Sequence, residues 1–301
     1  MDNNDFEVII IGGSYAGLSA SLTLGRSLRK TLIMDAGKPC NRQTPHSHNF
    51  LTQDGSTPEK ISNIAKLQVS KYDTIRFYEG FANSGKKTSR GFEIINSDGD
   101  TFTTKKIVIA TGIKDLIPSI TGFADCWGIS VIHCPYCHGY EFKNQKTAIL
   151  ANGDSAFHLA PLVHNLTKES AILTSGKPTF DKGQSEKLKM RNIRIMEKEV
   201  VEITHENGQV KTVVFKDSSK ESFDAVYAPI PFEQSSDIPV SLGCELTEQG
   251  YIKVDSMQKT NINGVFACGD NSTMMRSVAT AVYGGNIAGA AINKELTEES
   301  F

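Results

Sequence analysis

Apolar and polar positions fall into blocks along this chain, and the first blocks predict a strand, a turn, a helix and a second strand. Phe6 to Ile11 is a β-branched apolar run that is typical of a buried strand. It leads into a glycine-rich turn at 12–17, after which residues 18–24 have helical periodicity. A second apolar run, Thr31 to Met34, ends in Asp35. This order of elements indicates a dinucleotide-binding unit.

The glycine-rich turn carries the first candidate chemistry. Glycines allow a tight turn and the close approach of a pyrophosphate to N–H groups at a helix N-terminus, while the acid accepts hydrogen bonds from ribose hydroxyls. Ser14 replaces the middle glycine of the usual fingerprint, so a purely structural turn is the alternative. The residues predicted to contact a dinucleotide in this unit are Gly12, Gly13, Ser14, Ala16, Gly17 and Asp35.

The next blocks surround a long polar loop. Residues 37–55 are polar and rich in turn formers, and a loop of this length is uncommon without a function. Residues 58–72 predict a helix, and residues 77–102 predict short strands. Lys106 to Ile109 predicts a buried strand that ends in the small residues Ala110-Thr111-Gly112, where the backbone can pass close to a ligand.

The rest of the chain repeats the first pattern weakly and then returns to it. Together these blocks predict an α/β protein in which a second domain is inserted into a split first domain. The segments concerned are a crossing at 113–123, a strand, turn and helix at 147–160, strands at 192–201 and 210–215, a proline-rich return at 229–239, a strand ending in Gly269-Asp270 and a helix at 277–293.

Composition and charge exclude several classes of protein. Of the 301 residues, 32 are Lys or Arg and 34 are Asp or Glu, so the net charge of -2 favours neither nucleic acid nor an anionic membrane as a partner. No apolar run approaches the roughly 20 residues of a membrane helix, and Met1 to Asp5 lacks the layout of a signal peptide. We therefore expect a cytoplasmic protein.

Cysteine spacing singles out one short stretch. Of six cysteines only Cys134 and Cys137 form a close pair, with His133 and His138 on their outer sides. In a reducing compartment such a pair is more often catalytic or metal-binding than structural. A zinc site would need a second pair with ligand spacing, and the chain offers none, so we expect no metal. A plain structural disulfide is the other alternative.

Four motifs in a set order give a family resemblance over nearly the whole chain. The motifs are the glycine turn at Gly12 to Gly17, Ala110-Thr111-Gly112, Cys134 to Cys137, and Gly269-Asp270. In this order they resemble the low-molecular-weight thioredoxin reductases, which are FAD-dependent disulfide oxidoreductases. The resemblance implies two Rossmann-like domains, an FAD domain at 1–113 plus 246–301 and an inserted NAD(P)-type domain at 114–245 with the redox cysteines. It also implies a homodimer.

The same resemblance extends the set of flavin-binding residues. Gly269-Asp270 is expected on the ribityl-phosphate side of the flavin, and Ser277 stands where the family usually has a glutamine. The further residues implied to bind FAD are Asn41, Ala110, Thr111, Gly112, Gly269, Asp270, Arg276 and Ser277.

The second glycine turn departs from the family pattern. Its positions are Ala151, Gly153 and Ala156, and His158 stands where the family has an acid. The cluster that grips the 2′-phosphate of NADPH aligns with 175–177, which offers one lysine in place of two arginines. Lysine cannot reproduce the bidentate fork of arginine on a phosphate. NADPH as the electron donor is therefore doubtful.

The redox motif departs as well. Family reductases carry Cys-Ala-Thr-Cys-Asp, whereas this chain has Cys-Pro-Tyr-Cys-His at 134–138. This motif, with the His-x-His loop inside 41–55, resembles the dithiol oxidases that close disulfides in gliotoxin- and holomycin-type metabolites. By family position Cys137 lies against the flavin and Cys134 is the sulfur that meets the substrate. His138 replaces the family aspartate as candidate acid/base, since imidazole titrates near neutral pH.

Three functions follow from these expectations. The leading one is an FAD-dependent dithiol–disulfide oxidoreductase, not dependent on NADPH, that acts on a thioredoxin-like protein or a small-molecule dithiol, with oxygen or another carrier as the second partner. A conventional NADPH-dependent thioredoxin reductase is the second. A flavin-binding redox sensor, which signals through the state of the cysteine pair, is the third.

Overall fold

The computed structural model describes residues 4–301 and divides into two compact units. The first consists of residues up to 42, 49–114 and 232–301, and the second of 43–48 and 115–231. The inserted unit thus ends at Pro231, whereas we expected residue 245, and it also takes in a short piece of the long polar loop. The polypeptide crosses between the units through β7 (Ile113–Asp115) and β16 (Phe232–Gln234), which pair with each other.

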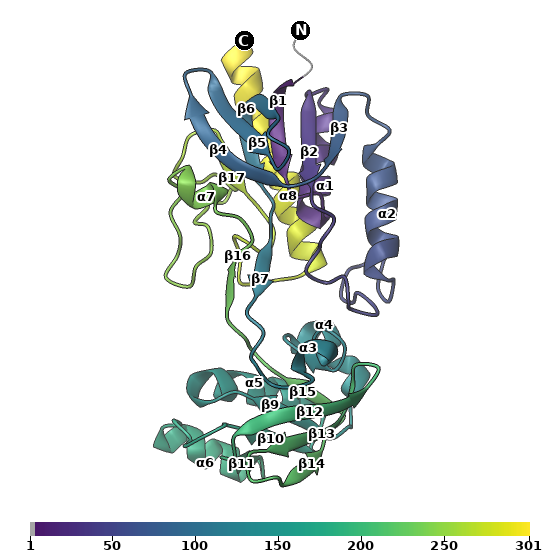
Figure 1. Ribbon diagram of the computed structural model, residues 1–301, viewed down its shortest axis with the longest axis vertical. Helices are drawn as coiled ribbons and strands as arrows, with labels where there is room; N and C mark the ends of the chain where they lie inside the picture. The colour runs from purple at the N-terminus through teal and green to yellow at the C-terminus, as the bar shows by residue number, and fades with distance from the viewer. Residues whose placement is uncertain (1–3) are drawn as a thin grey trace. The chain divides into compact units, whose positions relative to one another are not determined.

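The first unit is built on a sheet whose central strands are parallel (Figure 1). The strand order is β3-β2-β1-β6-β5-β4, and β17 also pairs with β6. Because β1, β2, β6 and β17 run parallel, their carboxyl ends, where the predicted motifs lie, meet at one edge. The bounds are β1 (Asp5–Ile11), β2 (Thr31–Asp35), β3 (Ile75–Glu79), β4 (Ala82–Thr88), β5 (Gly91–Asn96), β6 (Thr101–Ile109) and β17 (Val265–Ala267).

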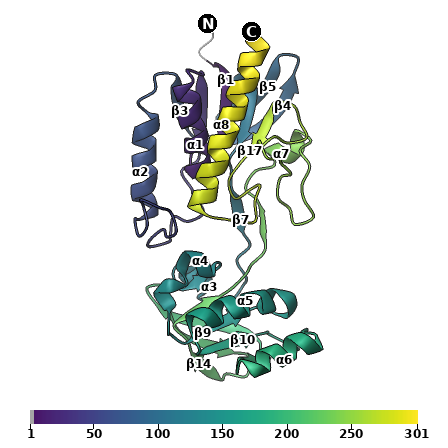
Figure 2. The same cartoon turned by 180° about the vertical axis from the view of Figure 1, so that it is seen from behind.

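Two helices pack side by side on this sheet, α1 (Tyr15–Arg26) and α8 (Val278–Ser300), as Figure 2 shows. Small residues allow the close approach: a Cβ on Gly285 would collide with the carbonyl oxygen of Ala16, and one on Gly289 would come within 2.7 Å of the Ala20 carbonyl oxygen. The helix predicted to end at 293 continues to Ser300. The remaining long helix of the unit, α2 (Pro58–Val69), begins after a Thr57 cap and ends three residues before the predicted position 72.

A buried lysine on β6 forms ion pairs with the C-terminal end of α8. Lys106 has a side chain only 4% exposed and donates to Glu295 at 2.8 Å and to Glu299 at 2.5 Å. Burial by itself lowers the pKa of Lys106, but the two carboxylates outweigh it and raise the pKa. The lysine therefore stays charged inside the protein.

We expect Lys106→Met to lower the free energy of unfolding by about 2 kcal/mol, because it removes one partner of a buried ion pair. The loss of stability is smaller than if both carboxylates were left without a partner, because Glu295 still pairs with Lys259 at 2.6 Å. Denaturant unfolding measures the difference. Lys253→Met, which breaks an exposed pair with Glu245 at 3.1 Å, is the control and should change the stability by less than about 0.5 kcal/mol. Equal effects of the two substitutions would contradict this account.

The inserted unit contains a second parallel sheet in the order β11-β10-β9-β15-β8, with a separate antiparallel sheet β12-β13-β14. The stretch 192–201 was predicted as one strand, and that prediction is wrong: it breaks into β11 and the start of β12. The bounds are β8 (Val131–Ile132), β9 (Thr147–Leu150), β10 (Ser170–Leu173), β11 (Arg194–Met196), β12 (Val200–Glu206), β13 (Gln209–Phe215), β14 (Lys220–Ser222) and β15 (Ala225–Tyr227).

The helices of the inserted unit include one that the sequence analysis missed. Besides α5 (Gly153–Leu166), helix α6 (Lys182–Met190) begins at Asp181, whose side chain forms a reciprocal capping box with Gln184. The Asp-x-x-Gln spacing was a readable signal for it. Short helices α3 (Phe123–Cys126), α4 (Pro135–His138), η1 (Tyr140–Phe142) and, in the first unit, α7 (Ile238–Ser241) complete the fold.

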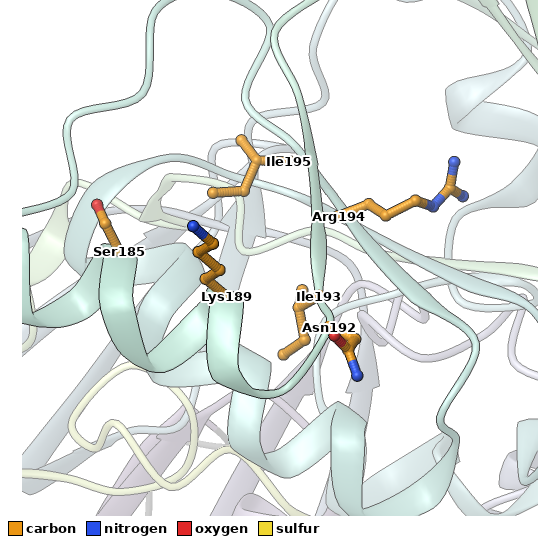
Figure 3. Close-up of a pocket in the computed structure, with 6 residues that line it drawn as sticks. All are labelled: Ser185, Lys189, Asn192, Ile193, Arg194 and Ile195. Carbon is orange, nitrogen blue, oxygen red and sulfur yellow. The ribbon is translucent and has the colours of Figure 1, made fainter.

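Two surface hollows lie away from the predicted site residues. One, of about 470 Å³, lies between α6 and the edge strand β11, where Figure 3 shows Lys189 and Ile195 close together and Arg194 pointing elsewhere. Arg194 pairs with Glu221, and charged side chains on an edge strand discourage pairing with other chains. The other hollow, of about 740 Å³, is lined by α1, α8 and residues 49–54 of the first unit. No helix within residues 4–301 is long and apolar enough to cross a membrane.

Candidate redox site and cofactor cradle

The glycine turn after β1 is shaped by positions that no side chain can occupy. Gly12 has φ +106°, and a Cβ there would collide with the carbonyl oxygen of Ala110 at the end of β6. A Cβ on Gly13 would lie 2.7 Å from the Cβ of Asp35. A Cβ on Gly17 would collide with the carbonyl oxygen of Gly12. The turn is therefore a bare backbone surface between three strand ends, with Asp35 beside it.

Buried polar atoms without partners lie at the same edge of the sheet. Thr111 Oγ1 and Asn271 Oδ1 are buried and have no hydrogen-bond partner in the protein, although Asn271 Nδ2 donates to the Ile109 carbonyl at 2.9 Å. Ser14 occupies the N-cap of α1 without a side-chain capping bond. A polar ligand at this edge would satisfy such groups, so the residues present fit FAD.

The other predicted cofactor residues gather near this edge with partners of their own. Asp270 lies 3.7 Å from Arg276 Nε and accepts from Cys40 Sγ at 3.6 Å. Gly269 would place a Cβ 3.0 Å from that of Ala16, so the end of β17 borders the start of α1. Asn41 donates to the Tyr15 hydroxyl at 3.2 Å. Gly112, with φ +65°, has open space beside it.

Two predicted residues use their side chains within the protein. Ser277 caps α8 by accepting from the Thr280 amide at 3.1 Å. Asp35 lies 3.5 Å from Lys66 Nζ and accepts from the Gly37 amide at 3.3 Å. Since the carboxylate of Asp35 also borders Gly13, it remains next to the turn where the ribose hydroxyls are expected.

The cysteine pair occupies a single helical turn at the carboxyl end of β8. Cys134 is the N-cap of α4, Pro135 takes the first helical position, and the Cys137 amide donates to the Cys134 carbonyl at 3.2 Å. Proline suits this position because its missing N–H has no helical partner there. Both cysteines and His138 are partly exposed. The spacing therefore places Cys134 at the start of one helical turn and Cys137 within it.

A second histidine and a carboxylate join His138. His48 comes from the loop piece 43–48 that belongs to the inserted unit. Its Nε2 lies 3.4 Å from Glu141 Oε1, and its ring stands edge-on to that of His138, with centroids 6.2 Å apart and planes at 83°. Burial lowers the pKa of His138, Glu141 raises it and His48 lowers it further, with a net lowering. His138 is therefore neutral at neutral pH and can accept a proton.

Three buried titratable groups of the protein contrast with the partly exposed pair. Tyr227, at the carboxyl end of β15, is buried, and burial with Glu141 and Cys134 close by raises its pKa to about 12. Burial also raises the pKa of Cys126 to about 11 and of Cys268 to about 12, so both stay protonated thiols. Within residues 4–301 no three His, Cys, Asp or Glu side chains are grouped to hold a metal.

The glycine turn of the inserted unit is filled by its own side chains. Asn152 Oδ1 accepts from the Gly153 amide at 2.8 Å and from the Thr179 amide at 3.0 Å. Thr179 Oγ1 lies 2.6 Å from the point where a Cβ on Gly153 would be. Asp154 puts a negative charge on the first turn of α5, where a pyrophosphate would bind. The amides of Gly153 and Thr179 are thus bonded within the protein, and the Asp154 carboxylate lies beside them.

Sequence reasoning missed Glu141 and Tyr227 as site residues and included His48 only as part of the His-x-His loop. Glu141 follows His138 by three positions, which is one helical turn, so its proximity was readable. Tyr227 and His48 are far from the cysteines in the sequence. Pairing of β15 with β8 brings Tyr227 close to them, and docking of the loop piece 43–48 on the inserted unit brings His48. His46, whose ring is 6.3 Å from that of His48, lies at the same place but is exposed.

Comparison with known proteins shows the family of the chain. Residues 6–285 match the pyridine nucleotide-disulphide oxidoreductase family. The chain is 31% identical to thioredoxin reductase tcpT of Claviceps purpurea, over 98% of this chain and 95% of that protein, and 30% identical to thioredoxin reductase sirT of Leptosphaeria maculans, over 96% and 93%. A putative thioredoxin reductase TrxB from Bacillus anthracis is 31% identical with a TM-score of 0.93, covering 98% and 100% of the two chains.

A second solved structure, that of HlmI, is 27% identical with a TM-score of 0.93 and covers 100% of this chain and 95% of its own. These matches confirm the expected fold, two Rossmann-like domains of thioredoxin-reductase type. They also imply FAD as the cofactor. The chain belongs to the pyridine nucleotide-disulphide oxidoreductase family and is a thioredoxin reductase-like flavin disulfide oxidoreductase.

Proposed function

We propose that this enzyme oxidises dithiols, with Cys134 and Cys137 as the redox pair and without NADPH as the electron donor. The observation that carries the proposal is the pairing of an exposed Cys-Pro-Tyr-Cys turn with a neutral, partly buried His138. The similarity to tcpT and sirT supports the resemblance to the gliotoxin-type branch. The occupied turn at Asn152 and Thr179 supports independence from NADPH.

The electrons and protons balance in such a reaction. One substrate thiol transfers its proton to His138, and the resulting thiolate attacks Cys134 of the Cys134–Cys137 disulfide, so that Cys137 leaves as a thiolate. The second substrate thiol then attacks the mixed disulfide and gives its proton to Cys134, which leaves as a thiol as the substrate disulfide closes. Two electrons and two protons have left the substrate. Bound FAD supplies the acceptor for these electrons and links them to dioxygen, which becomes hydrogen peroxide, or to another carrier.

The surface beside the cysteines suits an apolar or peptide-like dithiol. Tyr136 and Tyr140, on either side of Cys137, are 64% and 68% exposed. Exposed aromatic rings provide contact area at a small cost in side-chain entropy. We therefore propose a small-molecule dithiol or a thioredoxin-like protein as the substrate. On the family resemblance we propose a homodimer, and on composition and charge a cytoplasmic protein that acts without nucleic acid or membrane.

The conventional NADPH-dependent thioredoxin reductase is the second candidate, because the curated relatives bear that name. It uses the same cysteines in the opposite direction. The two candidates differ in which reagent delivers electrons, and a flavin-binding redox sensor differs from both in having no turnover.

An anaerobic titration followed by air tests the proposal. We expect dithiothreitol, or reduced thioredoxin, to bleach the flavin absorbance, and air to restore it with release of one peroxide per dithiol. NADPH and NADH should leave the flavin oxidised. Bleaching by NADPH at a rate comparable to the dithiol would establish the second candidate, and failure of every dithiol to bleach the flavin would refute the oxidase.

A further inference from the structure

The loop piece 43–48 is anchored on the inserted unit by buried side chains. Thr44 and Ser47 are 8% and 6% exposed. Gly128, with φ +78°, leaves no room for a side chain beside Thr44, whose Oγ1 lies 3.1 Å from the point where its Cβ would be. This packing fixes the loop on either side of His46 and next to His48. The packing of the loop therefore determines the position of the His48 ring.

Glu141 interacts with two imidazoles, those of His48 and His138. It follows His138 by three residues on the turn α4–η1, and it lies 3.4 Å from His48 Nε2. Its side chain is 39% exposed and that of His48 is 23% exposed. The rings of His48 and His138 stand edge-on to each other, with their centroids 6.2 Å apart. The carboxylate of Glu141 thus pairs with His48 and also acts electrostatically on His138.

We propose that His48 is a positioning residue of the redox site: by holding Glu141 in a pair of its own, it keeps His138 neutral and able to take the substrate proton. The inference rests on the proposed dithiol chemistry, because only a neutral imidazole can act as the base. A carboxylate released from His48 would instead stabilise the imidazolium of His138.

Besides burial, two charged side chains act on the pKa of His138. Glu141 on η1 and His48 on the loop are the charges that act on its pKa. Cys134 and Cys137 lie on its own turn. Burial raises the pKa of Tyr227 on β15 to about 12, so its phenol is neutral at neutral pH. Helix α5 packs on α4, but its His164 responds to burial, Lys168 and Arg191.

Titration of His138 by NMR of the flavin-loaded protein tests the proposal. The signal is identified by its loss in His138→Gln. His48→Phe keeps an aromatic ring but removes the pair with Glu141, and we expect the midpoint of His138 to rise by about 0.5 to 1 pH unit. Glu141→Gln should lower it, because the carboxylate that favours the imidazolium is gone. The double substitution should give a smaller rise than His48→Phe alone.

A second histidine–carboxylate pair provides the matched control. His205 Nε2 also lies 3.4 Å from a carboxylate, that of Asp125, in the same unit. His205→Phe should leave the His138 midpoint unchanged. His48→Gln, which can still donate to Glu141 but carries no charge, serves if phenylalanine disturbs the loop, and it should give a smaller rise in the same direction.

The outcomes separate this proposal from the proposed function. A His138 midpoint that stays within about 0.2 pH unit of the wild type in both His48 variants would overturn the positioning role, and so would an equal shift in His205→Phe. Failure of dithiols to reduce the wild-type flavin would instead overturn the oxidase reaction, whatever the titration shows. If both hold, the acid limb of the rate of flavin reduction should move with the His138 midpoint.

Discussion

Replacement of Cys134 by serine is expected to reduce turnover at least about a thousandfold while FAD remains bound. Cys134 is the sulfur proposed to form the mixed disulfide, and a serine hydroxyl cannot form one. The substitution preserves the structure, because Cys134 is the N-cap of α4 and serine is a favoured N-cap residue. Steady-state oxidation of a dithiol, measured by peroxide release, gives the loss, and the flavin absorbance per chain gives the occupancy.

Cys244→Ser is the matched control for this experiment. Cys244 is buried in the first unit with its sulfur 3.8 Å from Thr260 Oγ1, so a serine hydroxyl finds a partner in place. Turnover should stay within about twofold of the wild type. Retention of turnover by Cys134→Ser would show that the pair is not the redox centre, and an equal loss in both variants would point to a general defect of the fold.

Replacement of Gly12 by alanine is expected to lower the FAD content of the purified protein at least about tenfold, which corresponds to more than about 1.4 kcal/mol of binding free energy. The added Cβ collides with the Ala110 carbonyl, so the turn and the end of β6 must separate. The amides at the start of α1 and the orphaned Thr111 hydroxyl then move apart. Flavin absorbance per chain, and FAD affinity of the protein after flavin removal, measure the effect.

Gly99→Ala separates this collision from the general cost of a positive φ. Gly99 has φ +88°, but nothing lies within 4 Å of the position of its Cβ. Both substitutions bear the left-handed strain of about 1 kcal/mol, and only Gly12→Ala adds the clash at the cradle. We expect Gly99→Ala to keep its FAD. Full flavin content in Gly12→Ala would remove the turn from the cofactor site.

Much of the first unit could be predicted because its signals are local. The apolar runs at Phe6 to Ile11 and Thr31 to Met34 are strands, and the glycine turn between them begins a helix. A parallel sheet is buried on both faces, so its strands are continuous apolar runs that stand out from the surrounding sequence. The prediction failed at 192–201, where a polar turn between Met196 and Val200 separates two short strands that belong to different sheets.

The residues of the proposed cofactor cradle could be named from the sequence, but their surroundings could not. Gly12, Gly13 and Gly17 each meet a backbone or side chain from another part of the structure, and Asp35 borders the turn as expected. Because Ser14 stands in place of the middle glycine, the match to the dinucleotide-binding fingerprint is imperfect. What supports the site is the collision distances and the unpaired atoms of Thr111 and Asn271, which depend on neighbouring strands.

By itself the sequence determined the family resemblance, the glycine turn and the helix turn with Cys134, Cys137 and His138, because each is set by conformational preferences of a few consecutive residues. Only the tertiary structure decided the surroundings of those groups. The docking of His48 against Glu141, the burial of Tyr227 and the filling of the second turn by Asn152 and Thr179 join residues from separate segments. No short-range periodicity records such pairings, since burial and packing of the whole unit bring these side chains together.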